Sequence, residues 1–295
     1  SDLDCDVYRF NYVYRIDSKS LLSLIGSYKG WEANVALLYT HVQDHTVAQA
    51  DAMQKLTPMF LLSYKKDEWI FRAFHKRIFR APTLNDLYYT LVGNTKLNPE
   101  YTSQWDAGID YKGKRFHFAV DGYYNHIDDK IVAIPMKCQF RWSMVNFGKV
   151  KSYGASFSGG YNQDWGKFSL AANANYTYQI DKDYTMPSDP EYKNYIPYSP
   201  MHSGSVILDL GYDSYSLCTS FLYTGERFAL VSNNADDLLG DWYTIDLKLN
   251  KRFKIGKYVL QTTLECNNLT DSRHEVVKRY PMPGRNWKCT VKFEL

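Results

Sequence analysis

Apolar and polar residues alternate with a period of two along most of the chain, and this pattern restricts the folds open to it. In residues 166–180, GKFSLAANANYTYQI, one face carries Phe168 and Leu170 and the other carries Ser169 and Asn173. Successive side chains of a strand point to opposite faces, so this alternation predicts strands with one apolar and one polar face. Helical periodicity is scarce. We therefore predict an all-β fold.

The spacing of these runs narrows the fold class further. About fourteen runs occur, each near the roughly 9–11 residues that a tilted membrane strand needs, at 7–17, 20–28, 31–43, 58–65, 69–80, 101–111, 115–127, 147–161, 167–180, 201–212, 215–229, 241–253, 257–268 and 285–295. Short linkers lie at 29–30, 65–68, 112–114, 162–166, 213–214 and 254–256. Long linkers alternate with them, at 43–57, 81–100, 128–146, 181–200, 230–240 and 269–284.

This alternation of short and long linkers is typical of an antiparallel transmembrane β-barrel, which has short periplasmic turns and long extracellular loops. The polar faces are rich in Ser, Asn, Thr, Gln and Gly, as suits a wet lumen rather than the Lys- and Glu-rich surface of a soluble sandwich. By the same parity the C-terminus at Leu295 is expected on the periplasmic side of a bacterial outer membrane. Tyr and Trp near the short turns predict an interfacial girdle, formed by Tyr111, Tyr161, Trp165, Tyr212, Tyr215 and Tyr258.

Composition excludes several function classes. The net charge is +3 and no basic arm is present, so nucleic acid is not an expected partner. The five Cys are scattered without a CxxC pair, which predicts isolated thiols and no zinc ribbon. We find no GxSxG, HExxH or P-loop, and therefore predict no catalytic residues and no cofactor. No metal site is predicted, because a solvated acidic loop is the favoured interpretation of the loop carboxylates, with calcium binding as the alternative. These carboxylates are Asp128, Asp129, Asp181, Asp183, Asp189, Asp236 and Asp237. The proline residues are expected in loops or at strand edges, because Pro cannot donate to a ladder.

The segment FRAPTLNDLYY, residues 79–89, interrupts the alternation between two of the predicted strands. Pro82 is expected to stop strand pairing. Thr83, Asn85 and Asp86 have the side chains that cap a short helical turn. From the residues alone, a capped loop is the favoured interpretation.

In its order of motifs the chain resembles the TonB-dependent outer-membrane receptors of the vitamin, siderophore and haem group. The resemblance covers most of residues 60–295. It is carried by Phe79, Arg80, Ala81, Pro82 and Thr83, then by Leu87, Tyr88, Gly93 and Asn94, by Leu97, Asn98, Pro99 and Glu100, and by Trp105 to Gly108, by IPYSPMHSG at 196–204, by NNLTD at 267–271 and by YPMPGR at 280–285.

That resemblance implies a 22-stranded barrel whose lumen is filled by an N-terminal plug, with residues 1–295 as the C-terminal part of the barrel. The plug and the segment that engages the TonB complex are then expected upstream of Ser1. The family usually ends in an aromatic residue where this chain has Leu295. Haem receptors carry a His between the two motif elements, and residues 83–98 contain none, which argues against haem. The segments NDLYY at 85–89 and GNTKLNPE at 93–100 resemble corrinoid-type receptors more closely.

The function that we predict is therefore TonB-energised uptake of a scarce, bulky nutrient, such as a corrinoid, a ferric siderophore or haem, by a receptor embedded in outer-membrane lipid. The alternatives are a self-closing 14-stranded passive channel, an outer-membrane enzyme and a soluble β-sandwich. Aromatic and amide side chains of the long loops are candidate ligand contacts, with girdle or loop packing as the alternative for each. These candidates are Tyr88, Tyr89, His126, Trp142, Tyr184, Tyr195 and Trp242.

Overall fold

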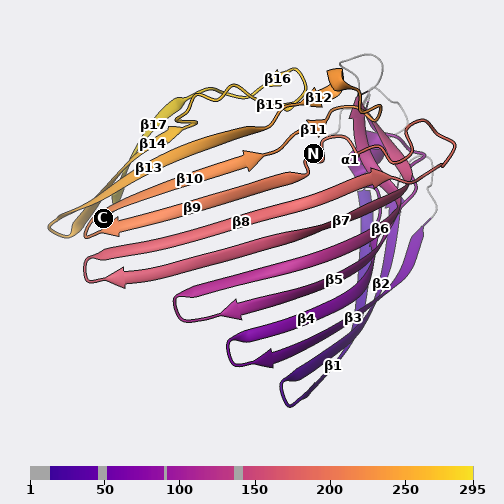
Figure 1. The fold of residues 1–295 in the computed structure, drawn as a ribbon, viewed down its shortest axis with the longest axis horizontal. Helices are drawn as coiled ribbons and strands as arrows, with labels where there is room; N and C mark the ends of the chain where they lie inside the picture. The colour runs from indigo at the N-terminus through magenta and orange to yellow at the C-terminus, as the bar shows by residue number, and fades with distance from the viewer. Residues whose placement is uncertain (1–13, 46–51, 90–91, 136–141, 295) are drawn as a thin grey trace.

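In the computed structural model, which describes residues 14–45, 52–89, 92–135 and 142–294, one large curved antiparallel sheet dominates (Figure 1). Its strands are β1 (Tyr14–Tyr28), β2 (Trp31–His45), β3 (Met53–Lys66), β4 (Trp69–Arg80), β5 (Glu100–Lys112), β6 (Phe116–Pro135), β7 (Trp142–Trp165), β8 (Phe168–Asp183), β9 (His202–Tyr212), β10 (Tyr215–Thr224), β13 (Trp242–Ile255), β14 (Tyr258–Asn267) and β17 (Asn286–Glu294).

Each strand pairs with its neighbour in the chain, so the topology is a simple meander. Two short ribbons lie apart from it, β11 (Arg227–Phe228) with β12 (Leu238–Leu239) and β15 (Glu275–Val277) with β16 (Tyr280–Pro281). A five-residue helix, α1 (Leu84–Tyr88), and a 3₁₀ turn, η1 (Ala235–Asp237), lie in the loops. In the part of the chain that is described, no helix is long and apolar enough to cross a membrane. The all-β antiparallel prediction is confirmed.

The sheet has thirteen strands where about fourteen runs were predicted. The difference lies at residues 7–17 and 20–28, for which the alternation predicts two strands. From Tyr14 onward they form one, because pairing with β2 continues unbroken through Ser18 and Lys19. The two polar residues Ser18 and Lys19 have the composition of a turn, but both pair with β2 in a continuous ladder. Residues before Tyr14 lie outside the described part.

The predicted alternation of short turns and long loops is confirmed. Hairpin turns lie at one end of the sheet and the long connections at the other (Figure 1). The first hairpin shows the local cause: Lys29 and Gly30 both have positive φ, 45° and 85°. That geometry is the type I′ turn, whose twist matches that of the flanking strands. The last described residue of β17, Glu294, lies at the turn end, while Leu295 is outside the described residues.

The two faces of the sheet differ in polarity and in solvent exposure. In β7, Val150 and Ser152 are buried, whereas Tyr153 and Phe157, on the opposite face, are exposed. Side chains crowd together on the inside of a curved sheet, so the sheltered face is the concave one. Register places on this face a polar lining that includes the ion pairs of Arg72 with Asp110 and Asp121. The six predicted girdle residues all fall on the convex, apolar face.

One prediction about proline was wrong. Pro58 lies inside β3, not at a strand edge, and is paired with Leu37 of β2. Next to it the ladder between β3 and β4 ends, at Met59–Lys76, although β2–β3 pairing continues to Met53. A residue without N–H is tolerated in a sheet where the ladder stops. The upper part of the β3–β4 seam is therefore open.

Candidate functional site

The Pro-broken segment after β4 folds as the capped loop that its residues predicted. The side-chain oxygen of Thr83 accepts a hydrogen bond from the backbone N–H of Asp86 at 3.1 Å. The Asp86 carboxylate accepts one from the N–H of Thr83 at 2.8 Å. This reciprocal capping box satisfies two helix donors that would otherwise lack partners, and so starts α1.

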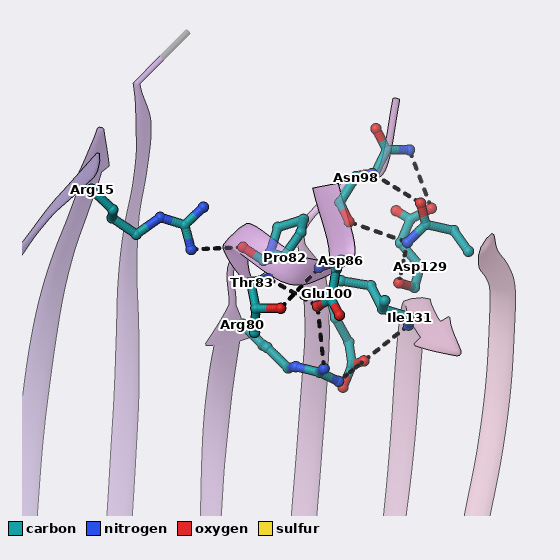
Figure 2. Close-up of polar contacts among 10 residues, drawn as sticks. Arg15, Arg80, Pro82, Thr83, Asp86, Asn98, Glu100, Asp129 and Ile131 are labelled. Atoms are coloured by element: carbon teal, nitrogen blue, oxygen red, sulfur yellow. Dashed lines mark hydrogen bonds and ion pairs between the residues drawn. The ribbon is translucent and has the colours of Figure 1, made fainter. Parts of the chain in front are cut away.

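Arg80 and Glu100 join this loop to the neighbouring strand, as Figure 2 shows. Nη1 of Arg80 lies 3.4 Å from Oε2 of Glu100, and Nη2 lies 3.7 Å from the carboxylate of Asp86. The same Glu100 oxygen accepts a hydrogen bond from the backbone N–H of Ile131 in β6 at 3.1 Å. A single carboxylate thus connects the loop after β4 with the upper end of β6.

The remaining motif residues are also structural. Asn98 donates its backbone N–H to Asn146 at 2.9 Å and its side-chain amide to Asp129 at 3.4 Å. Pro82, fully buried, accepts at its carbonyl a 2.6 Å hydrogen bond from Arg15 of β1 (Figure 2). The motif therefore fastens the loop to strands on both sides, while Ala81 and Pro99 are half-buried within it.

Three other long loops pack against one another at the same end of the sheet. The side chain of Asn233, in the loop after β10, accepts from the N–H of Tyr195 at 2.6 Å and donates to its carbonyl at 3.1 Å. The N–H of Tyr198 donates to the carbonyl of Phe228 at 2.8 Å, and the rings of Tyr195 and Phe228 stack. We call the assembly of residues 184–201, 225–241 and 268–285 the loop roof.

A buried cation holds the last two loops of the roof together. Arg227 is only 5% exposed and donates to the carbonyls of Glu275 at 2.5 Å and Val276 at 3.2 Å. Burial lowers the pKa of this guanidinium, and carbonyl oxygens are its hydrogen-bond acceptors. A second link is the ion pair between Lys278 and Asp237 at 3.0 Å.

An apolar groove of about 410 Å³ lies at the roof. It is lined by Trp142, from the first residue of β7, and by Val276, Val277, Tyr280 and Met282 of the last loop. Trp142 also contacts the roof directly, with its ring centroid 5.8 Å from that of Tyr198, a residue whose pKa burial raises. A groove with aromatic and aliphatic walls can hold the flat or apolar face of a large ligand.

The structure separates the predicted ligand contacts. Trp142 lines the groove, Tyr195 belongs to the roof, and Tyr184 packs edge-on against Tyr192. Trp242 stacks on His274 with centroids 4.2 Å apart, and its buried indole N–H has no hydrogen-bond acceptor among the described residues.

Three candidates lie elsewhere. Tyr88 is buried in α1 beside Leu87 and Leu97, and Tyr89 is exposed after it. Register places His126 on the convex face, away from the lumen. The sequence analysis did not single out Arg227 or the apolar residues at 276–282. The signal for the apolar residues is the adjacent pair Val276 and Val277 inside an otherwise polar loop.

Acidic side chains gather in the loop after β8 without forming a metal site. Burial, reinforced by the carboxylates of Asp189 and Asp183, raises the pKa of Glu191. Asp183 accepts hydrogen bonds from the backbone and hydroxyl of Thr185. Across the described ranges, no three His, Cys, Asp or Glu side chains are grouped so as to hold a metal ion.

Comparison with known proteins gives concordant results. The family model described as "TonB dependent receptor-like, beta-barrel" matches residues 8–269. The vitamin B12 transporter BtuB of Vibrio vulnificus is 23% identical over 220 residues, which are 73% of this chain and 33% of that protein. The FrpB iron transporter of Neisseria meningitidis superposes with a TM-score of 0.69 at 15% identity, over 97% of this chain and 46% of that one.

The copper transporter OprC superposes with a TM-score of 0.72 at 15% identity, over 95% of this chain and 47% of its own. The chain thus spans about a third of the length of the curated relative and just under half of the solved structures. At such low identity, the superpositions on these solved structures establish the fold alone. The family-model match across residues 8–269 shows that the chain belongs to the family of TonB-dependent receptor-like β-barrels.

Proposed function

We propose that this chain is the C-terminal part of the barrel of an outer-membrane receptor that takes up a scarce, bulky nutrient with energy delivered by TonB. The observation that carries the proposal is the loop roof with its apolar groove, held at one end of a sheet whose concave face is polar. A ligand captured at the groove is positioned above a hydrophilic passage. The plug on which TonB pulls belongs, in this proposal, to the preceding part of the protein.

Among the possible nutrients, the groove favours a ligand with a large neutral or apolar face. An anionic ferric siderophore needs cations at its binding surface, and the residues that line this groove include none. A corrinoid meets this description, and the curated relative is a vitamin B12 transporter.

Orientation follows from the same proposal. The roof faces the cell exterior, the hairpin turns face the periplasm, and the C-terminus is periplasmic because β17 ends at the turn end. Outer-membrane lipid surrounds the convex face.

Uptake of radiolabelled cyanocobalamin by cells that carry the complete protein tests the proposal. We expect uptake that depends on TonB, and a Trp142→Ala variant with affinity lowered by about tenfold, the loss expected for one well-packed aromatic contact. Trp165→Ala, a convex-face change at the turn end, is the matched control. Uptake that continues without TonB contradicts the receptor mechanism and supports the passive-channel alternative.

A further inference from the structure

A basic row crosses the convex face just below the loops. Register places Arg77, Ser103, His126, Lys151 and Lys182 directly opposite one another on β4 to β8. Directly opposed side chains on one face of a sheet have Cβ atoms about 5 Å apart. This row therefore presents three permanent cations and one histidine along a single line.

In the part of the chain that the structure describes, the three permanent cations of the row have no carboxylate partner. Within the described residues, Lys151 and Lys182 lie over the rings of Tyr184 and Tyr195, at 4.4 and 4.6 Å, and Arg77 forms no ion pair. One carboxylate is close to the row: that of Asp128, 3.5 Å from Nε2 of His126.

The strands beyond β8 show that the row is not a general feature of this end of the sheet. Their convex-face residues nearest the loops are neutral or weakly basic: His202, Tyr223 and Tyr243. The cations of the row thus mark one sector of the wall.

Directly beneath the row is an apolar cavity of about 780 Å³. Its floor is a line of small residues, Ala73, Ala107, Gly122 and Ala155, which register places opposite one another on β4 to β7. Three interstrand spacings make this floor about 14 Å long. A rim of aromatic residues separates the floor from the basic row: Trp105, Tyr124 and Tyr153.

Gly122 shows that the cavity is not a by-product of tight packing. A Cβ added at Gly122 meets no atom within 4 Å, whereas one at Gly154 clashes with the carbonyl oxygen of Tyr178. Glycine inside a strand is unfavourable by about 0.5–1 kcal/mol relative to alanine, and no neighbouring atom or positive φ demands it at Gly122. Such a glycine is typical of a place where an external group approaches the backbone closely.

We propose that this sector of the convex face binds one anionic membrane lipid, with its phosphate at the basic row and an acyl chain along the small-residue floor. The charge is complementary, since cations lacking carboxylate partners at a membrane boundary attract phosphate. The position also fits, because the cavity opens on the apolar face that lipid surrounds. This inference depends on the membrane-barrel fold and not on which nutrient is carried.

Native mass spectrometry of the complete protein in mild detergent, titrated with phosphatidylglycerol or phosphatidylcholine, tests the proposal. Each Lys or Arg beside anionic lipid contributes roughly a fivefold gain in affinity. We expect Arg77→Gln with Lys151→Gln and Lys182→Gln to weaken phosphatidylglycerol binding by at least about tenfold, with little effect on phosphatidylcholine. Gly122→Leu, which fills the floor, should weaken both lipids.

Two controls match these changes. Lys114→Gln removes an exposed cation in a hairpin turn, and Gly26→Leu fills an equally open glycine position on the convex face of β1. Both should leave lipid binding unchanged. The proposal is overturned if the triple variant retains phosphatidylglycerol as the unmodified protein does. It is also overturned if inorganic phosphate displaces the lipid at equal concentration, since the acyl chain then contributes nothing.

Discussion

Replacing Arg227 by methionine tests whether one buried cation holds the loop roof together. Methionine preserves much of the apolar bulk of the side chain but removes all guanidinium donors. The carbonyls of Glu275 and Val276 then lose the donors that now lie 2.5 and 3.2 Å away. The β15–β16 ribbon, which forms one wall of the groove, loses this attachment to β11.

The magnitude follows from these two bonds. A hydrogen bond to a charged group contributes about 1.5–3 kcal/mol. The contacts to the carbonyls of Gly225 and Gly240, at 3.5 and 3.4 Å, are too long to add much. Because the released carbonyls can bind water, we take the lower value for each short bond. Opening of the ribbon should then become easier by about 3 kcal/mol, or roughly a hundredfold.

Hydrogen exchange of peptides that cover residues 273–282, measured on the complete protein in detergent, reports this opening. Exchange should accelerate by about two orders of magnitude in Arg227→Met and by less in Arg227→Lys, which keeps the charge but not the planar fork. Arg273→Met, an exposed change in the same loop, is the control. Unchanged protection in Arg227→Met refutes the role assigned to this residue.

Three further predictions concern separate features. Thr83→Ala removes the cap of α1 and should raise local exchange there by an amount equivalent to about 1 kcal/mol. Burial and nearby carboxylates raise the pKa of Glu191, so the neutral carboxyl group stabilises the folded loop. This stabilisation is lost as the pH rises through the raised pKa. Glu191→Gln should therefore increase thermal stability at about pH 7 but not at about pH 4. Gly154→Ala should destabilise the barrel in thermal unfolding, since its Cβ clashes with the Tyr178 carbonyl oxygen, whereas Gly122→Ala should be neutral or stabilising by up to about 1 kcal/mol. Similar unfolding midpoints for both variants contradict the packing argument.

Much of the fold could be predicted from the sequence because strand periodicity and linker length are local signals. The tight turns, the convex girdle and the Thr83 cap each depend on a few neighbouring residues. The cap was readable because its donor and acceptor lie three residues apart. The order of the motif around Pro82 and Asn98 gave the family.

The rest depends on contacts between distant segments, which one sequence does not reveal. Ser18 and Lys19 look like a turn until pairing with β2 is known. Arg227 resembles any loop arginine, and only the approach of the last loop, 48 residues further along, buries it. The position of His126 near a loop predicts a ligand contact, but the parity of β6 places its side chain on the convex face.

The open seam beside Pro58 has a mechanical consequence. Above Met59–Lys76 no registered pairing joins β3 to β4, so the loop-end parts of these strands can separate without breaking a ladder bond, whereas the pairs from Met59–Lys76 to Lys66–Trp69 hold their lower parts together. Side-chain contacts cross that line in the structure, among them Arg15 to the Pro82 carbonyl at 2.6 Å and Lys55 over the Tyr101 ring at 4.2 Å. The loop end of the sheet can therefore open along the β3–β4 seam, where side-chain contacts rather than backbone hydrogen bonds set the distance between the two strands.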